Sequence, residues 1–288
     1  PGIDRIFFHS PGTNNTFESR DVDYELVARA KLFHLGYPPL MRRMHENDGA
    51  EMIKIFKKVK ETGTITSLDM SLPDPNSPSG QVDWHKILKN LLPYVDIFQP
   101  SIEEGTFMAR RERFFKYRER CKKELLDEFS PADYSDLGEQ FLAWGSRIAS
   151  IKTGHRGIYI RTADAATLAP IAELLPMDTA NWANREIWAP AYKIQRILSA
   201  TGSGDSSIAG LLAATIRGLP IEQAAKMSSS LGYQNLHELD AISGIRGWDE
   251  SVAITEDASI GVIPPNIDDA AWQHDEDTQT YRGPADKA

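Results

Sequence analysis

Short apolar runs alternate along this chain with segments whose apolar residues recur every three or four positions. Short runs rich in branched residues predict buried strands, at residues 5–9, 32–36, 64–69, 95–98, 148–154 and 157–161. Helical spacing predicts helices at residues 21–31, 47–62 and 82–92. Because strands that alternate with helices form parallel sheets covered on both faces, the fold class predicted is α/β, with three α/β/α layers and a mostly parallel central sheet.

Three polar positions follow predicted strands. Asp69 ends one strand, Glu104 comes shortly after another, and Thr153 lies in the turn between the last two. Ligands of such sheets bind beyond the carboxyl ends of the strands. We therefore expect these three residues at one edge of the sheet, in one shared site.

Residues 105–144 are helical in pattern and rich in charge. A solvated helix explains them better than a polyanion-binding arm, because Glu112, Glu119 and Glu124 are interspersed among the basic residues. From residue 267 the chain becomes polar and acidic. We predict one domain over residues 1–266 and a poorly ordered tail over residues 267–288.

The stretch at residues 199–210 carries the clearest chemistry. Gly202, Ser203 and Gly204 precede Asp205, and a helix with one apolar face follows, formed by Ile208, Leu211, Leu212 and Ile216. A turn of small residues at a helix N-terminus presents free backbone N–H groups to a phosphate. Asp205 then suits a base that takes a proton from an attacking hydroxyl, although an acidic first turn also compensates the helix dipole in ordinary helices.

Aromatic residues cluster shortly before this stretch. Trp182, Trp188 and Tyr192 are expected near the rim of the pocket, where they either stack on a base or sugar or pack in the core.

Composition limits the classes of function. A chain of 288 residues can bury one large α/β core, and its net charge of −9 argues against general nucleic-acid binding. Cys121 is the only cysteine, which excludes intrachain disulfides and thiolate metal clusters and favours the cytoplasm. No apolar run approaches the length of a membrane span, so no membrane partner is expected. The chain starts at Pro1, and we expect it to begin inside a larger gene product.

Several segments occur in the order and spacing of one known family. They are residues 35–38, 67–69, 95–104, 151–157 and 200–210. Thr-Gly-Ser-Gly-Asp, at residues 201–205, is the most specific of them. In these segments the chain, up to about residue 235, resembles the ribokinase-like (PfkB) carbohydrate kinases.

The resemblance implies transfer of the γ-phosphoryl group of ATP to a hydroxyl of a small-molecule sugar or nucleoside acceptor. By the same resemblance, Asp205 is the base and the N–H groups of Gly202, Ser203 and Gly204 form the anion hole. Glu104 helps to organise Mg²⁺ through water. The residues implied to bind the nucleotide are Lys152, Thr153, Gly154, Gly157 and Thr201.

Some positions depart from the family pattern. Ser101 stands where an Asn is usual beside Glu104, and Ser199 replaces an Asp, which puts a monovalent-cation site in doubt. No Gly-Gly-x-x-x-Asn motif is present, and no opening strand carries the substrate-binding Asp. We therefore expect the chain to lack the family's N-terminal strands and lid. Because that lid often builds the dimer contact, a homodimer is an open expectation.

The sequence disfavours several other classes of function. The glycines do not match a dinucleotide-binding motif, no P-loop Gly-Lys-Ser/Thr exists, and the seven histidines include no i, i+4 pair. Ser203 lacks the Gly-x-Ser-x-Gly context of a hydrolase nucleophile. The serious rival is a ribokinase-like sensor or pseudokinase that binds ATP or a sugar without turnover.

Overall fold

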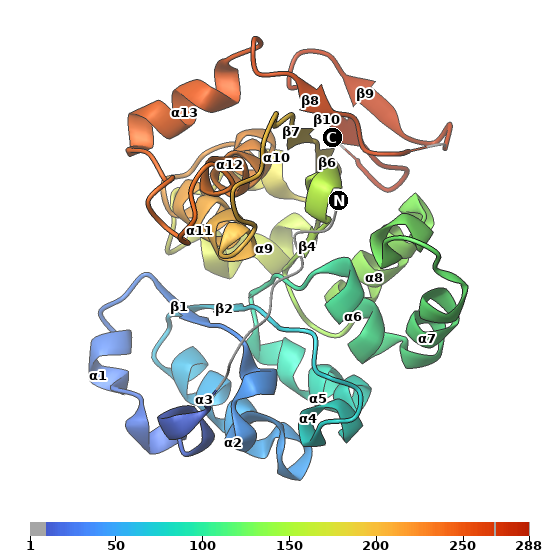
Figure 1. The fold of residues 1–288 in the computed structure, drawn as a ribbon. Helices are drawn as coiled ribbons and strands as arrows, with labels where there is room; N and C mark the ends of the chain where they lie inside the picture. The colour runs from blue at the N-terminus through green and yellow to red at the C-terminus, as the bar shows by residue number, and fades with distance from the viewer. Residues whose placement is uncertain (1–9, 268, 288) are drawn as a thin grey trace. The chain divides into compact units, whose positions relative to one another are not determined.

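Four parallel strands form the sheet in the first half of the chain, in the order β1-β2-β3-β4. They are β1 (Leu32–Leu35), β2 (Ile65–Leu68), β3 (Ile97–Phe98) and β4 (Ile148–Lys152). In Figure 1, β1 and β2 lie side by side, with Leu32 paired to Ile65. β2 and β3 are buried along their whole length, as parallel strands covered on both faces are. The strands predicted at residues 32–36, 64–69, 95–98 and 148–154 are confirmed.

The computed structural model describes residues 10–267 and 269–287, so the strand predicted at residues 5–9 lies outside the described residues. Within these ranges the chain forms two compact units, an N-terminal unit (residues 10–151) and a C-terminal unit (residues 152–287). The α-helices of the N-terminal unit are α1 (Tyr24–Val27), α2 (Arg42–His45), α3 (Ala50–Glu61), α4 (Pro78–Gln81), α5 (Trp84–Leu91), α6 (Ile102–Ala109), α7 (Arg111–Arg120) and α8 (Pro131–Ala143).

Helix α3 follows its predicted pattern closely. Its apolar residues Met52, Ile55, Phe56 and Val59 are fully buried, so one face stabilises the helix through packing. The helix begins after Gly49, whose φ of +71° is left-handed, and whose added Cβ would lie 2.8 Å from Cγ2 of Ile87 in α5. A glycine is therefore required where α3 starts against α5.

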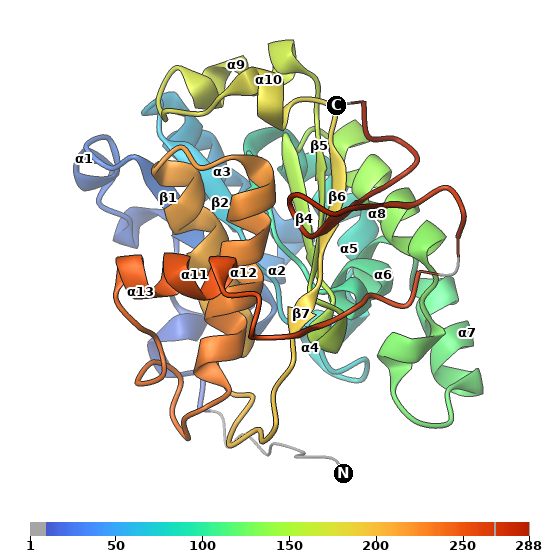
Figure 2. The ribbon, with the colours of Figure 1, turned by 90° about the horizontal axis from the view of Figure 1, so that it is seen from above.

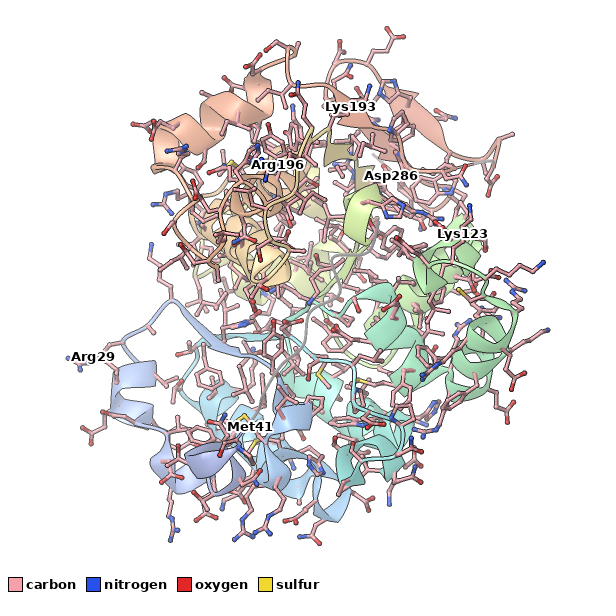
Figure 3. All side chains as sticks on the ribbon, viewed as in Figure 1. Arg29, Met41, Lys123, Lys193, Arg196 and Asp286 are labelled. Carbon is pink, nitrogen blue, oxygen red and sulfur yellow. The ribbon has the colours of Figure 1, made fainter. Side chains whose placement is uncertain are left out.

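The helix predicted at residues 21–31 is wrong over most of its length, because only α1 is helical there. Leu26 is 56% exposed and Val27 is the one buried residue of α1, so no apolar face exists to hold a longer helix. Arg29 is exposed and points away from the ribbon in Figure 3.

The charge-rich stretch at residues 105–144 is three helices and not one. Helix α6 ends at Ala109, because Arg110 after it has a non-helical φ of −141°, and Pro131 opens α8 after a Ser130–Asp133 capping box. Side chains of α7 and its N-cap form ion pairs with α8, since Arg110 lies 2.8 Å from Asp136 and Arg113 lies 2.9 Å from Asp133. These pairs favour the solvated-helix interpretation over a polyanion-binding arm.

In the C-terminal unit the strands of the eight-stranded sheet pair antiparallel, which the sequence did not predict. They are β5 (Ile158–Thr162), β6 (Glu186–Ala189), β10 (Thr280–Arg282) and β9 (Gln273–Asp275), in that order. β7 (Ala191–Tyr192) pairs with β8 (Val262–Ile263). In Figure 2, β5 and β6 run side by side. The helices are α9 (Ala165–Ala172), α10 (Thr179–Trp182), α11 (Ser203–Ile216), α12 (Ile221–Asn235) and α13 (Trp248–Glu256).

Helices α11 and α12 pack against each other, and α12 also contacts β5 and β6. Their approach is close because Gly210 has no side chain; an added Cβ would lie 2.5 Å from the carbonyl oxygen of Met227. Within residues 10–267 and 269–287, no helix is both long and apolar enough to span a bilayer.

Residues 269–287 of the acidic tail include two paired strands, so the prediction of disorder is wrong for this part of the tail. Strand β10 pairs with β6, and Trp272 is only 8% exposed. The ring of Trp272 lies 5.8 Å from that of Trp188 and 6.2 Å from that of Tyr159. Burial of one large aromatic side chain outweighs the polar composition around it.

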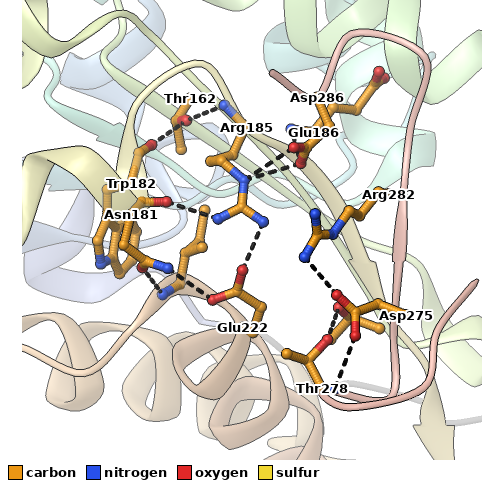
Figure 4. Close-up of polar contacts among 12 residues, drawn as sticks. Thr162, Asn181, Trp182, Arg185, Glu186, Glu222, Asp275, Thr278, Arg282 and Asp286 are labelled. Carbon is orange, nitrogen blue, oxygen red and sulfur yellow. Dashed lines mark hydrogen bonds and ion pairs between the residues drawn. The ribbon is translucent and has the colours of Figure 1, made fainter. Parts of the chain in front are cut away.

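A buried arginine ties the end of the chain to this sheet. Arg185 is 1% exposed, and Figure 4 shows its guanidinium between two carboxylates. Its Nε donates to Asp286 at 3.0 and 3.2 Å, and its Nη2 donates to Glu222 at 2.6 Å. Nη1 donates to the carbonyl oxygen of Asn181 at 2.7 Å. The arginine thus connects the last residues to the N-terminal turn of α12.

This network makes stability depend on pH. Burial raises the pKa of the Glu222 carboxyl, but hydrogen bonds from Asn181 and Arg185 outweigh that effect and bring the pKa below 4.5. A carboxyl with a lowered folded pKa stabilises the fold above its unfolded pKa, and this contribution is lost as pH falls through the folded pKa. We expect the difference in unfolding free energy between wild type and Glu222→Gln to shrink below about pH 4.5. Urea unfolding at several pH values measures it, and a constant difference would contradict this account.

Candidate functional site

The N-terminus of α11 is built on a left-handed glycine. Gly202 has φ +84°, and an added Cβ would lie 2.5 Å from Cβ of Ala241. Ser203 follows as the first helical residue, and its hydroxyl donates to the carbonyl oxygen of Ala200 at 3.0 Å. The turn therefore depends on glycine for both conformation and space. Its N-cap residue offers no side-chain hydrogen bond to the helix.

Backbone donors are available at this turn. Among the residues that the structure describes, the N–H groups of Gly202 and Gly204 have no hydrogen-bond acceptor. Asp205 is exposed in the first turn of α11. Two open N–H groups at the positive end of a 14-residue helix are suited to an anion, whereas the third predicted donor, the N–H of Ser203, donates to the carbonyl oxygen of Ala200 at 3.3 Å.

The turn between β4 and β5 is the second part of the site. Gly157 has φ +97°, and an added Cβ would lie 2.1 Å from the carbonyl oxygen of Ala189 in β6. Thr153 is fully buried, and its N–H donates to the carbonyl oxygen of Gly157 at 3.1 Å. The indole Nε1 of Trp188 donates to the carbonyl oxygen of Arg156 at 2.8 Å. These contacts fix the loop against β6.

One cavity of about 330 Å³ joins the two parts, within the C-terminal unit. Five of the residues predicted from the sequence to form the site line it, namely Lys152, Gly154, Gly157, Ser203 and Gly204. An added Cβ on Gly204 would lie 3.8 Å from Cδ of Lys152, which places the two segments next to each other.

Five other predicted site residues do not line this cavity, and one of them, Glu104, belongs to the N-terminal unit. Thr153 is buried in the loop, while Thr201, Gly202 and Asp205 adjoin the lining residues along the chain. The N–H of Thr201 donates to Oγ of Ser199 at 3.1 Å, so Ser199 supports the turn.

The residues of α12 that line the cavity were not predicted from the sequence. Tyr233 and Ser229 of α12 line it together with Tyr192, and the rings of Tyr192 and Tyr233 lie 5.5 Å apart. Burial raises the pKa of Tyr192. Trp182 and Trp188, expected near the rim, are core residues instead, each about 1% exposed. The signal that could have found Tyr233 is its place one helical turn after Ser229, on one face of α12.

Glu104 belongs to the N-terminal unit and has a structural role there. The N–H of Ser101 donates to Oε2 of Glu104 at 2.6 Å, and the N–H of Glu104 donates to Oγ of Ser101 at 3.2 Å. This capping box starts α6 after β3. Ser101, which the sequence marks as a departure, is thus explained as a helix cap. Asp69, directly after β2, is 1% exposed.

In the described ranges no three or more His, Cys, Asp or Glu side chains form a group that could hold a metal ion. Mg²⁺ keeps several waters and is usually bound by one or two carboxylates together with substrate phosphates, so it needs no such cage.

Two glycines of the turn offer a matched test. Gly202→Ala meets a left-handed φ and Ala241, and is expected to cost about 2 kcal/mol or more of unfolding free energy. Gly204→Ala has its nearest neighbour at 3.8 Å and lies in a helix, so it is expected to stabilise by up to about 1 kcal/mol. Urea unfolding compares them. Equal effects would rule out the conformational requirement at Gly202.

Known proteins are similar to this chain in sequence over most of its length. A family model described as pfkB family carbohydrate kinase matches residues 3–248. An uncharacterized sugar kinase of Archaeoglobus fulgidus is 21% identical over 242 residues, which are 84% of this chain and 75% of that protein.

Two solved structures share the fold. The ribokinase of Thermotoga maritima has a TM-score of 0.55 and 16% identity, over 86% of this chain and 64% of that one. A protein of E. coli described as a ribokinase II, in complex with ATP and Mg²⁺, has a TM-score of 0.56 and 14% identity, over 84% and 63%. The chain therefore spans less than two thirds of either structure. The predicted α/β class, with parallel strands in a central sheet, is confirmed.

Proposed function

This chain belongs to the pfkB family of carbohydrate kinases, and we propose that it transfers the γ-phosphoryl group of ATP to a hydroxyl of a sugar or sugar-like acceptor. The observation that carries this proposal is the shared cavity. It brings the loop with Lys152, Gly154 and Gly157 against the N-terminus of α11. A nucleotide needs both an apolar, aromatic-lined hollow for its base and backbone donors for its phosphates.

Each part of the cavity has a role in this proposal. The wall with Tyr192 and Tyr233 would hold the base, because two aromatic rings offer faces for stacking. The loop would pass along the nucleotide at Gly154 and Gly157, where no side chain keeps the backbone away. The phosphates would extend toward Gly202 and Gly204, whose N–H groups have no acceptor in the described chain.

Asp205 would act as the base in the transfer step. The acceptor hydroxyl attacks the γ-phosphorus while its proton passes to the Asp205 carboxylate. The bond between the γ-phosphorus and the bridging oxygen breaks, and ADP leaves. Negative charge on the transferring group is stabilised by the N–H groups at the start of α11 and by the helix dipole.

Mg²⁺ would neutralise charge on the phosphates of ATP. We propose that Glu104 supports it through water, in addition to capping α6. The E. coli protein named above is described in complex with ATP and Mg²⁺, which supports the choice of cofactor. Since Ser199 is used within the turn at Thr201, we propose no monovalent cation there.

The experiment is an assay of ADP release with MgATP and a pooled panel of sugars, sugar acids and nucleosides. ADP that requires the acceptor would support a kinase, and separating the pool would name the acceptor. MgATP binding without acceptor-dependent ADP would favour the alternative, a nucleotide-binding sensor without turnover.

A further inference from the structure

A second hollow lies in the N-terminal unit, outside the site described above. Its volume is about 670 Å³. It is lined by Asn15 of η1 (Gly12–Asn15) and its N-cap, and by residues from the segments 39–48 and 78–83. Its lining combines apolar residues, among them Pro39, Leu40 and Val82, with polar ones such as Asn15, His45 and Asp83. A hollow of this size is within the range of small-molecule sites.

His45 is the unexplained polar group in this hollow. It ends helix α2, it is 6% exposed, and its Nδ1 is buried without a hydrogen-bond partner in the described chain. Burial lowers the pKa of His45, with Glu46 opposing and Arg42 adding to the effect, so the ring is neutral near pH 7. A neutral ring carries one proton.

The position of that proton follows from the buried nitrogen. A buried N–H group without an acceptor is rarer in proteins than a buried acceptor without a donor. We therefore assign the proton to Nε2 and leave Nδ1 as the unpaired acceptor. Unlike Nδ1, Nε2 is not buried, and it has no hydrogen-bond partner among the described residues. The hollow that His45 lines is therefore where this donor meets solvent.

The charged groups around the hollow already compensate one another. Arg42 lies 3.4 Å from Glu46, and Asp48 lies 2.6 Å from Lys86. Asp83 accepts the N–H of Lys86 at 3.0 Å. No excess positive charge is left for an anion, and the described residues hold no group of three metal-binding side chains. The hollow is suited to an uncharged ligand with several hydroxyls.

The geometry points to a binding site for a small neutral polyol, a monosaccharide or sugar alcohol, at His45. The Nε2–H donates to a ligand hydroxyl oxygen, and the carboxylate of Asp83 accepts a hydroxyl proton. Pro39, Leu40 and Val82 cover the C–H face of the ligand. This site does not depend on the phosphoryl transfer proposed above, and it binds without nucleotide.

The first test uses the full chain without ATP. The imidazole nitrogens are observed by ¹H–¹⁵N NMR while D-ribose, D-glucose, D-fructose, myo-inositol and glycerol are added separately to millimolar concentrations. We expect at least one probe to shift the Nε2 resonance of His45 in a saturable way and to leave His274 unmoved. His274, exposed in β9 of the C-terminal unit, is the internal control. If no probe moves His45, the proposal is overturned.

Two variants test the donor itself. His45→Phe keeps the ring but removes the N–H, and is expected to weaken binding about tenfold; His45→Gln returns an N–H near Nε2 and is expected to restore most of it. Equal affinity in wild type and His45→Phe would overturn the proposal. The Asp205→Asn variant should bind the same probe unchanged, so failure of kinase activity and failure of this site are distinguishable.

Discussion

Asp205→Asn is expected to lower acceptor-dependent turnover by about two to four orders of magnitude and to leave nucleotide affinity within about threefold. The amide keeps the shape of the carboxylate but cannot take the proton of the attacking hydroxyl. Since the cavity is lined by neighbours of Asp205 and not by Asp205 itself, the nucleotide loses little contact. Steady-state kinetics and calorimetric titration with MgATP measure the two effects.

The matched control is Asp249→Asn. Asp249 also lies exposed in the first turn of a helix, α13, where it compensates the dipole without adjoining the cavity. Both variants should lose similar, small amounts of unfolding free energy, up to about 1 kcal/mol. Only Asp205→Asn should lose turnover. Equal turnover in the two variants would reduce Asp205 to an ordinary helix-capping charge.

Arg185→Met is expected to cost about 3–5 kcal/mol of unfolding free energy. The methionine fills much of the space of the arginine stem, but Glu222 and Asp286 lose the cation that lies 2.6 and 3.0 Å from them. A buried charge without a partner is far more destabilising than a lost surface ion pair. Chemical unfolding followed by circular dichroism measures the difference.

Two further variants test the reason for this effect. Arg196→Met removes an exposed arginine of the same unit (Figure 3) and is expected to change the unfolding free energy by less than about 0.5 kcal/mol. Arg185→Met combined with Glu222→Gln and Asp286→Asn removes all three charges and should recover part of the loss. A loss below about 1 kcal/mol in Arg185→Met would contradict the described network.

Most strands of the N-terminal unit and its helix α3 were predictable because their information is local. The strands at β1 and β2 are short runs bounded by turn residues, and α3 carries its apolar face in its own sequence. The antiparallel half was not predictable in this way. β9 and β10 have three residues each, and what holds them is Trp272 packed on Trp188, a contact between distant parts of the chain.

The candidate site also has a part that local sequence predicts and a part that depends on tertiary packing. The turn at Gly202 could be predicted, because a left-handed turn before a helix requires glycine and the following residues show the helix. Local sequence places Tyr233 on one face of α12 with Ser229, but whether this face borders the cavity depends on how α12 packs. The structural role of Ser101 was predictable from local sequence, because Ser-Ile-Glu-Glu is the pattern of a capping box. The resemblance to the family instead emphasised that Ser101 stands where an Asn is usual.

The most direct measurement follows the fate of the γ-phosphoryl group by ³¹P NMR, with the wild-type chain, MgATP and the acceptor pool in one sample. The account predicts that a phosphate monoester of an acceptor appears in step with ADP, and that neither forms with Asp205→Asn. ADP formed with inorganic phosphate alone, in equal amount with and without acceptors, would contradict transfer to a hydroxyl of a sugar.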